Sequence, residues 1–385
     1  MNFAKRIENL PPYLFAEIDK KIAGKKSQGI DVISLGIGDP VEPTPPHIIE
    51  RLYREAKVPE NQRYPSYYGL PAFRESIARW YQRRFSVSLD PDTEVLPLIG
   101  SKEGLAHIYL ALLDSDETCL VADPGYPVYT TGAILAGGRI DYVPLLAEND
   151  FNPDLAQIPA DIASSAKLLW LNYPNNPTAA VAHDNLFNQV VEFAKEHRVV
   201  ICHDNPYSEI TFDGYVGPSF LQTPGAKEVG IEFHSLSKTY NMTGWRIGFA
   251  VGNAKVLEAL GRVKTNVDSG IFNAIQYAGV EALEGPQNSI EEMVRIYARR
   301  RDMVVDTLKE VGLEVTKPKA TIYVWVSVPK NETSDSFQTH ILEQANVVVS
   351  PGHAYGPSGE GYIRISLTVK DDRLEEALER IKKVL

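Results

Sequence analysis

The chain has 385 residues, enough for one large domain with a smaller one, or for two domains of similar size. Hydrophobic residues make up 44% of it, and no apolar run approaches the roughly 20 residues that cross a bilayer, so the composition predicts a soluble globular protein and excludes a membrane partner. The formal net charge of −11 argues against nucleic acid as a partner, because phosphate contacts require a basic surface.

The N-terminal segment, residues 1–44, has neither the apolar region nor the small-residue cleavage site of a secretory signal. The expected location is therefore the cytoplasm. The segment is rich in proline and glycine near its end, and we expect it to pack on a smaller domain or on a neighbouring subunit.

Residues 45–285 are predicted to form a large cofactor-binding domain. From about residue 95, short apolar runs alternate with helical periodicities, a pattern typical of a parallel sheet. The clearest unit runs from a strand at 168–171 through a helix at 184–197 to a strand at 199–202, and such a unit is right-handed and buried on both faces. The predicted fold class is α/β, with a mostly parallel sheet flanked by helices.

The two cysteines, Cys119 and Cys202, each fall inside an apolar, strand-like run. This placement predicts buried thiols and neither a disulfide framework nor a metal-binding pair. No metal site is expected elsewhere in the chain.

Residues 286–385 are predicted to form a smaller α+β domain. A long helix is expected near 287–312, strands at 322–326 and 362–366, and a final amphipathic helix whose apolar stripe includes Leu374 and Ile381. The basic run at residues 299–301 lies within the long helical pattern, and we expect it on a solvated helix face.

Five polar clusters each follow directly after a predicted strand of the large domain. Because ligands of open parallel sheets bind at the carboxyl ends of the strands, these clusters predict a single site at one sheet edge. The clusters are 100–102, 123–126, 172–178, 204–207 and 235–238.

The segment from Ser235 to Arg246 carries a lysine between hydroxyls and an arginine eight positions after that lysine. Lys238 can supply the amine that holds pyridoxal phosphate as an imine. Ser235 and Ser237 can donate hydroxyls to the phosphate, and Arg246 offers a planar charged fork. A solvated lysine in an ordinary polar loop is the alternative. The apolar runs 231–236 and 247–251 favour a lysine on a short polar loop between two core strands.

Pyridoxal phosphate acts as an electron sink only if its ring nitrogen stays protonated, which requires a buried carboxylate beside it. Asp204 is the candidate for that carboxylate. Tyr207, three residues on, and Asn176 at the adjacent strand end can donate to the phenolic oxygen of the cofactor. The alternatives are that Asp204 caps a helix and that Asn176 belongs to a simple turn.

Two further clusters complete the candidate cofactor site. Tyr126 follows a Pro-Gly turn and can lay its ring over the pyridine, although such a ring can also fill a core. Ser101 and the amide of Lys102 stand where a helix begins, which suits an anion such as the phosphate.

These motifs make the chain resemble the fold type I pyridoxal-phosphate enzymes of the class I and II aminotransferases over nearly its whole length. The matching residues in family order are Tyr64, Gly100-Ser101-Lys102, Tyr126, Asn176, Asp204, Tyr207, Ser235, Ser237, Lys238, Arg246 and Arg364. The resemblance implies that Arg364 clamps the substrate α-carboxylate bidentately, with Tyr126 and Asn176 also at the substrate. It further implies a homodimer with shared active sites, in which Tyr64 reaches the partner's phosphate.

The implied reaction is transamination of an amino acid against a 2-oxo acid in two half-reactions. The substrate amine displaces Lys238, and the freed lysine then moves a proton from the substrate Cα.

The segments 35–40, 100–104 and 237–246 are more closely similar to LL-diaminopimelate aminotransferases of lysine biosynthesis, which usually pair diaminopimelate with 2-oxoglutarate. In that family, residues matching Tyr13, Gly38 and Lys102 take part in substrate recognition. One departure concerns the residues after Tyr64, where some members place Glu-Gln-Gly and this chain has tyrosines at 67 and 68. Tyrosine can accept a hydrogen bond from an ammonium but supplies no charge.

Three alternatives remain at this point. A broader aspartate, alanine or aromatic aminotransferase would use the same anchor residues. A C–S β-lyase would share them too, but would release ammonia and pyruvate without a 2-oxo acid. A cofactor-sensing transcriptional regulator would need a basic helix-turn-helix before residue 100, and none is visible.

Overall fold

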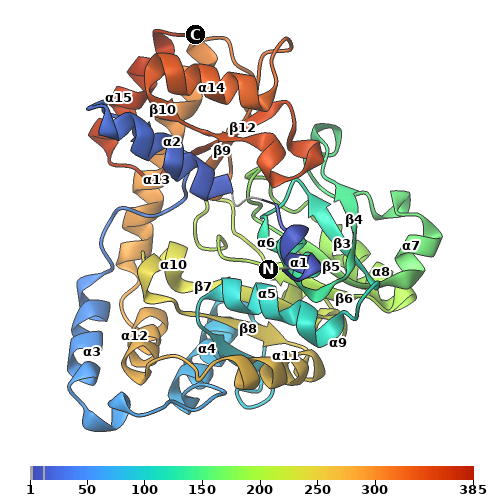
Figure 1. Cartoon of the computed structure of the whole chain (residues 1–385). Coiled ribbons are helices and arrows are strands. Elements are labelled where there is room, and N and C mark those ends of the chain that lie inside the picture. Colours follow the sequence, from blue (N-terminus) through green and yellow to red (C-terminus); the bar gives the residue numbers. More distant parts are fainter. Residues whose placement is uncertain (1–2, 12–13) are drawn as a thin grey trace.

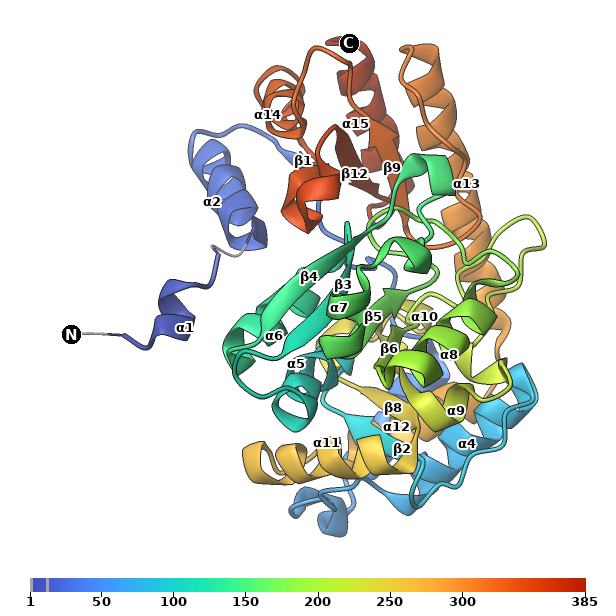
Figure 2. The ribbon, with the colours of Figure 1, turned by 90° about the vertical axis from the view of Figure 1, so that its right-hand side faces the viewer.

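The computed structural model describes residues 3–11 and 14–385. In Figure 1 the C-terminal elements lie together at the top, while the central sheet and its helices fill the lower part. Helix α13 (Asn288–Glu310) runs along both parts. Near the N-terminus, α1 (Lys5–Glu8) and α2 (Leu14–Ser27) stand to one side of the body in Figure 2.

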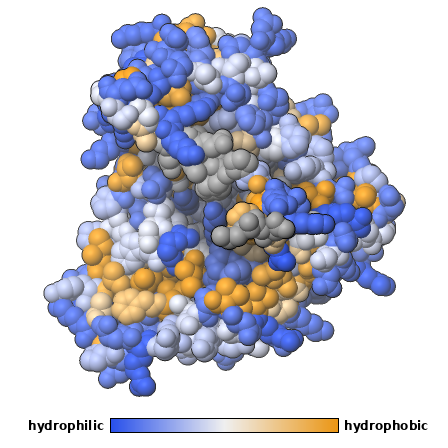
Figure 3. Space-filling model, viewed as in Figure 1, coloured by the Kyte–Doolittle hydropathy of each residue, from blue (hydrophilic) through white to orange (hydrophobic). Residues whose placement is uncertain are grey.

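The face seen in Figure 1 carries a band of apolar surface across its lower part, over α5 (Ser101–Leu112), α11 (Ala254–Val267) and α12 (Asn273–Glu284) (Figure 3). Large apolar side chains exposed along these helices include Leu110, Val267 and Phe272. Among the described residues, none of the helices combines the length and apolar character needed to cross a lipid bilayer.

The larger sheet of the described chain has seven strands in the order β2-β8-β7-β6-β5-β3-β4. Only β8 runs antiparallel to its neighbours, which confirms the predicted mostly parallel α/β fold. The strands are β2 (Val95–Leu98), β3 (Thr118–Asp123), β4 (Arg139–Pro144), β5 (Ala166–Asn172), β6 (Val200–Asp204), β7 (Gly230–Ser235) and β8 (Gly248–Gly252).

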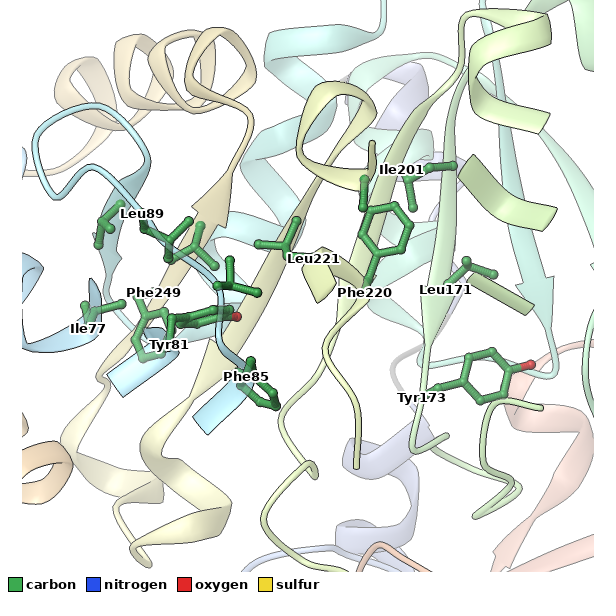
Figure 4. Packing of buried hydrophobic residues seen from close by; sticks show 14 of the residues in the cluster. Ile77, Tyr81, Phe85, Leu89, Leu171, Tyr173, Ile201, Phe220, Leu221 and Phe249 are labelled. Atoms are coloured by element: carbon green, nitrogen blue, oxygen red, sulfur yellow. The ribbon is translucent and has the colours of Figure 1, made fainter. Parts of the chain in front are cut away.

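Helices cover both faces of this sheet because its central strands are apolar on both sides. In β5, Leu169 and Leu171 point to one core cluster, while Leu168 and Trp170 point to the other. Figure 4 shows part of the first of these clusters, in which Leu221 and Phe220 lie between the side chains of α4 on one side and those of β5 and β6 on the other. The remaining helices of this part are α3 (Pro46–Ala56), α4 (Pro71–Phe85), α6 (Val128–Ala136), α7 (Ala160–Ser165), α8 (Leu186–His197), α9 (Ala226–Val229) and α10 (Leu236–Thr239).

The C-terminal elements surround a smaller antiparallel sheet in the order β11-β12-β9. The N-terminal strand β1 pairs in parallel with β10, so the start of the chain is tied to these elements. The division into three parts at residues 44 and 285 stays a prediction. The bounds are β1 (Ile33–Ser34), β9 (Tyr323–Ser327), β10 (Val347–Val348), β11 (Ser350–Pro351), β12 (Tyr362–Ser366), α14 (Ser334–Ala345) and α15 (Asp371–Lys382).

The basic run in α13 departs from its prediction. Arg300 and Arg301 are only 3% and 1% exposed, so the expected solvated face was wrong for these two residues. Each guanidinium is neutralised by acids that come from elsewhere in the chain, such as Asp371 beside Arg300 and Asp213 beside Arg301. Local periodicity cannot reveal such partners, and without them the burial of either charge would be costly.

A fully buried carboxylate, Glu232, links β7 to its surroundings. It accepts hydrogen bonds from the hydroxyl of Tyr81 at 2.7 Å and the backbone amide of Phe220 at 2.8 Å. His203 and His234 hydrogen-bond to the same carboxylate at 2.7 and 3.0 Å. Burial alone would raise the pKa of Glu232, but the hydrogen bonds from the two histidines outweigh it and hold that pKa well below its ordinary value.

Replacing Glu232 by glutamine should lower the free energy of unfolding by about 3–5 kcal/mol, because an amide cannot accept from every donor in this buried cluster. Since the folded pKa is depressed, the wild-type contribution is present above the ordinary glutamate pKa and lost as the pH falls below it. Denaturant unfolding at neutral pH would measure the difference. Glu228→Gln, on an exposed side chain, is the control, and equal stability of the two variants would contradict the prediction.

Candidate active site

A cavity of about 430 Å³ lies at the carboxyl ends of the parallel strands. It brings together residues that follow β2, β3, β5, β6 and β7, as the positions of the polar clusters predict. The predicted residues that line it are Gly38, Ser101, Lys102, Tyr126, Asn176, Asp204, Tyr207, Ser235, Ser237, Lys238, Arg246 and Arg364.

One predicted site residue does not line this cavity, and for another the structure gives no placement. Tyr64 is 86% exposed and lies in a separate surface hollow with Arg63 and Phe272. Tyr13 lies outside the described residues.

Lys238 differs from its prediction in local structure, because it sits in the one-turn helix α10 and not in a loop. The hydroxyl oxygen of Ser235 caps this helix by accepting from the amide of Ser237 at 3.2 Å. The Lys238 amine donates to the carbonyl oxygen of Gly38. Its burial, together with the charges of Arg364 and Arg246, lowers the pKa of Lys238 below its ordinary value, although Tyr323 and Asp39 oppose this. The amine therefore loses its proton more readily than a surface lysine does.

Asp204 ends β6 with its carboxylate buried at the cavity wall, and it caps none of the described helices. One carboxylate oxygen, Oδ2, accepts from the hydroxyl of Tyr129 at 2.8 Å. The other, Oδ1, is also buried but has no hydrogen-bond partner among the described residues. Burial raises the pKa of Asp204 to about 6, against the opposing effect of the Tyr129 hydrogen bond. An oxygen in this state calls for a donor from a bound molecule.

Asn172 and Asn176 join the ends of β5 and β6. The side-chain amide of Asn172 donates to the backbone oxygen of Asp204, and its oxygen accepts from the backbone amide of Asn176, both at 2.6 Å. The side-chain oxygen of Asn176 in turn accepts from Arg364 at 2.7 Å. This leaves the Nδ2 group of Asn176 as its donor toward the cavity.

Another part of the cavity wall is built around the start of α5. Gly100 precedes this helix with φ of 71°, a conformation that favours glycine. The guanidinium of Arg246 packs directly on it, because a Cβ at position 100 would lie 2.2 Å from Nη2 of Arg246. A helix N-terminus and an arginine fork on one side of a cavity form an anion site.

Arg364 lies in β12 and is almost fully buried. Besides Asn176, it donates through Nη2 to the carbonyl of Gly36 at 2.6 Å. Its guanidinium carbon is 4.0 Å from the ring centre of Tyr323 and 4.8 Å from that of Tyr355. These contacts fix the plane of the positively charged Arg364 guanidinium at the cavity wall.

Two tyrosines of the site were not predicted from the sequence: Tyr323, which lines the cavity, and Tyr129, which donates to the Asp204 carboxylate behind the cavity wall. Tyr129 lies in the apolar helix α6 and stacks on Trp170 with ring centres 4.8 Å apart, so its pattern is that of a core residue. Tyr323 belongs to the apolar strand β9. The one feature that connects Tyr323 to the site is the pairing of β9 with β12. Tyr323 pairs with Ser366, and this places it diagonally across from Arg364.

Comparison with known proteins places the chain in a family. The model of the family "aminotransferase class I and II" matches residues 30–381. An LL-diaminopimelate aminotransferase of Moorella thermoacetica is 57% identical, covering 100% of this chain and 99% of the relative. One from Desulforudis audaxviator is 58% identical over 98% and 97% of the two chains. The solved structure of apo-BacF from Bacillus subtilis has 39% identity and a TM-score of 0.96, covering 100% and 99% of the chains.

The family match spans most of the chain, and the relatives match from end to end. The predicted fold type I architecture, aminotransferase activity and pyridoxal-phosphate dependence are therefore confirmed at the level of the family. The chain belongs to the class I and II aminotransferases, a family of pyridoxal-phosphate-dependent enzymes.

Proposed function

We propose that this aminotransferase moves an amino group between LL-2,6-diaminopimelate and 2-oxoglutarate, in the direction of tetrahydrodipicolinate and glutamate or the reverse, in lysine biosynthesis. The observation that carries the proposal is the similarity over the whole chain, at 57% and 58% identity, to relatives that bear this name. The cavity supports it through the chemistry of its side chains.

The residues of the cavity fit pyridoxal phosphate. Asp204 offers a buried oxygen without a partner among the described residues, which suits the protonated ring nitrogen. The start of α5, with Ser101 and Lys102, faces the cavity together with Arg246 and suits the phosphate. When bound, the cofactor supplies an electron sink for negative charge that develops at the substrate Cα.

In this proposal Ser235 and Ser237 complete the phosphate site. The hydroxyl oxygen of Ser235 is occupied as the cap of α10, but its proton remains available to donate to an anion. Tyr126 covers the ring, while Tyr207 and Asn176 donate to its phenolic oxygen.

Lys238 is the catalytic residue of the proposal. Its amine attaches the cofactor covalently and, once released, takes the proton from the substrate Cα. Its lowered pKa favours the neutral amine that both tasks require. The carbonyl of Gly38, which also lines the cavity, holds Nζ in place, and this limits the positions from which the proton is taken.

Arg364 binds the α-carboxylate of either substrate. Its fork is already oriented by Asn176 and Gly36, so little side-chain entropy is lost when a carboxylate binds. We assign recognition of the distal end of diaminopimelate to Tyr13, Gly38 and Lys102, with Tyr126 and Asn176 beside the reacting end.

A homodimer is the proposed assembly. Tyr64 is exposed and outside the cavity of its own chain, and Phe272 beside it belongs to the apolar surface near α12. A second copy that covers this surface would account for its exposed apolar side chains. We assign Tyr64 to the phosphate of the partner's cofactor.

The first experiment is a half-reaction. The cofactor-loaded protein is mixed separately with LL-diaminopimelate, aspartate, alanine and phenylalanine, without any 2-oxo acid, and the absorbance of the bound cofactor is followed. We expect fast conversion to the amino form with LL-diaminopimelate and at least about 100-fold slower conversion with the others, because a site built for a second charged end leaves its donors unpaired with shorter substrates. Equal or faster conversion with aspartate would contradict the substrate assignment while leaving the aminotransferase intact.

A further inference from the structure

Tyr323 contacts several functional groups of the cavity at once. Its side chain is only 3% exposed, and it lines the cavity from β9. Its hydroxyl oxygen lies 3.2 Å from that of Tyr207, and its ring centre lies 4.0 Å from the guanidinium carbon of Arg364. Gly38, whose carbonyl accepts from the catalytic amine, packs against the same hydroxyl.

The ring of Tyr323 can hold the guanidinium of Arg364 by its face. Aromatic faces carry negative potential, and a buried arginine stacked on one keeps its plane. Tyr355 adds a second ring at 4.8 Å. Hydrogen bonds to Asn176 and Gly36 hold Nη1 and Nη2, and the rings add resistance to rotation of the guanidinium out of its plane.

The hydroxyl of Tyr323 fixes that of Tyr207. The two rings meet edge to face at 5.8 Å, and the two hydroxyls are hydrogen-bonded, with Tyr207 as the donor when no cofactor is bound. When Tyr207 gives its one proton to the cofactor, Tyr323 becomes the donor of this hydrogen bond. The Tyr323 hydroxyl has little freedom, since a Cβ at position 38 would lie 2.1 Å from it. Burial and the neighbouring Tyr323 raise the pKa of Tyr207, so Tyr207 keeps its proton. Burial alone would raise the pKa of Tyr323 too, but the charges of Arg364 and Lys238 hold it below its ordinary value.

We propose that Tyr323 is a positioning residue that orients the carboxylate-binding fork of Arg364 through its ring and the hydroxyl of Tyr207 through its own hydroxyl. The proposal rests on the proposed function, because it takes Arg364 as the substrate clamp and Tyr207 as a donor to the cofactor. Tyr323 therefore contacts both Arg364 in β12 and Tyr207 in the loop that follows β6.

The hydroxyl is tested with Tyr323→Phe in the cofactor-loaded enzyme without substrate. The readout is the pH at which the absorbance of the bound cofactor changes. We expect this pH to rise by about 0.5–1 unit, because a less firmly held Tyr207 stabilises the phenolic oxygen less. Tyr297→Phe is the control, since Tyr297 is buried in the same core cluster but does not line the cavity. An unchanged midpoint in Tyr323→Phe, matching that control, would overturn this half of the proposal.

The ring is tested by comparing Tyr323→Phe with Tyr323→Leu under steady-state conditions, with whichever amino donor the wild-type enzyme converts fastest. Loss of the ring should raise KM for both the amino acid and the 2-oxo acid about 5- to 30-fold and leave kcat nearly unchanged, whereas phenylalanine should keep KM within about 2-fold. Equal KM values in both variants would overturn the role of the ring. Because the donor is chosen by rate and the titration needs no donor, an error in the assigned substrate would not mimic either result.

Discussion

The variant Lys238→Ala is expected to lose transamination by at least about 10⁴-fold while keeping the wild-type fold. It removes both the proposed point of covalent attachment and the proposed base for the Cα proton, and general base catalysis alone contributes about 10²–10⁴-fold. The free energy of unfolding should not fall in this variant. Burial removes the hydration of the Lys238 amine and the hydrogen bond to Gly38 replaces only part of it, so the amine contributes little to stability.

Turnover with the best amino donor gives the first readout, and reduction by borohydride followed by peptide mass analysis gives the second. In the wild type, the mass of the cofactor should stay on the peptide that contains Lys238. Lys102→Ala is the matched control, because Lys102 lines the same cavity, and this variant should keep the label on Lys238. Undiminished turnover in Lys238→Ala, or a label found on Lys102, would remove the proposed mechanism.

For Asp204→Asn we expect turnover to fall about 10³-fold and the affinity for the cofactor to fall with it. Breaking a buried charge pair costs about 3–5 kcal/mol, which corresponds to this factor. Asparagine keeps the shape of the side chain and can still accept from Tyr129. What it loses is the charge on the oxygen that faces the cavity, and with it the means to keep the cofactor ring nitrogen protonated.

The same substitution should stabilise the protein at neutral pH once the cofactor is removed. Burial raises the pKa of Asp204 to about 6 in the folded state, so the folded chain holds this proton more tightly than the unfolded one. Stability without cofactor therefore falls as the pH rises from about 4 to about 6, by about 3 kcal/mol in all. The variant's asparagine has no proton to lose in this range, so this fall should be absent from Asp204→Asn.

Denaturant unfolding of both cofactor-free proteins at pH 4.5 and pH 7 would measure the effect. For cofactor affinity, which is measured separately, Asp123→Asn is the control. Asp123 is also a buried carboxylate whose pKa burial raises, but it does not line the cavity. It should leave cofactor affinity unchanged. Wild-type affinity in Asp204→Asn would contradict the role assigned to Asp204.

Much of the fold was predictable because strands that are buried on both faces appear in the sequence as short, continuous apolar runs. The strand predicted at 362–366 is β12 to the residue, and the helix predicted at 184–197 is α8 beginning two residues later, at Leu186. The arginines of α13 were mispredicted, because a helix face that contacts distant acids looks the same as one that contacts water. The residues around Lys238 form a one-turn helix and not the predicted loop, because Ser235 caps the helix. The four residues of such a short helix are too few to show a helical pattern in the sequence.

The candidate site was predictable for a different reason. Its polar residues interrupt apolar strands at the same edge of a parallel sheet, so their common location follows from topology. Tyr129 and Tyr323 gave no such interruption, since each stands among apolar neighbours where an aromatic ring has an ordinary packing role. Their hydroxyls matter through partners, Asp204 and Tyr207, that lie 75 and 116 positions away.

One wall of the cavity joins the first tenth of the chain to the last. The carbonyl of Gly36 accepts from Arg364, that of Leu35 from the amide of Ser366, and that of Ile37 from the hydroxyl of Thr368. During synthesis on the ribosome, this wall has no second half until almost the whole nascent chain has emerged. Asp204, Lys238 and Arg246, which we assign to the cofactor, are synthesised well before Arg364, which we assign to the substrate carboxylate. A growing chain therefore contains its proposed cofactor-binding residues long before it contains its proposed substrate clamp.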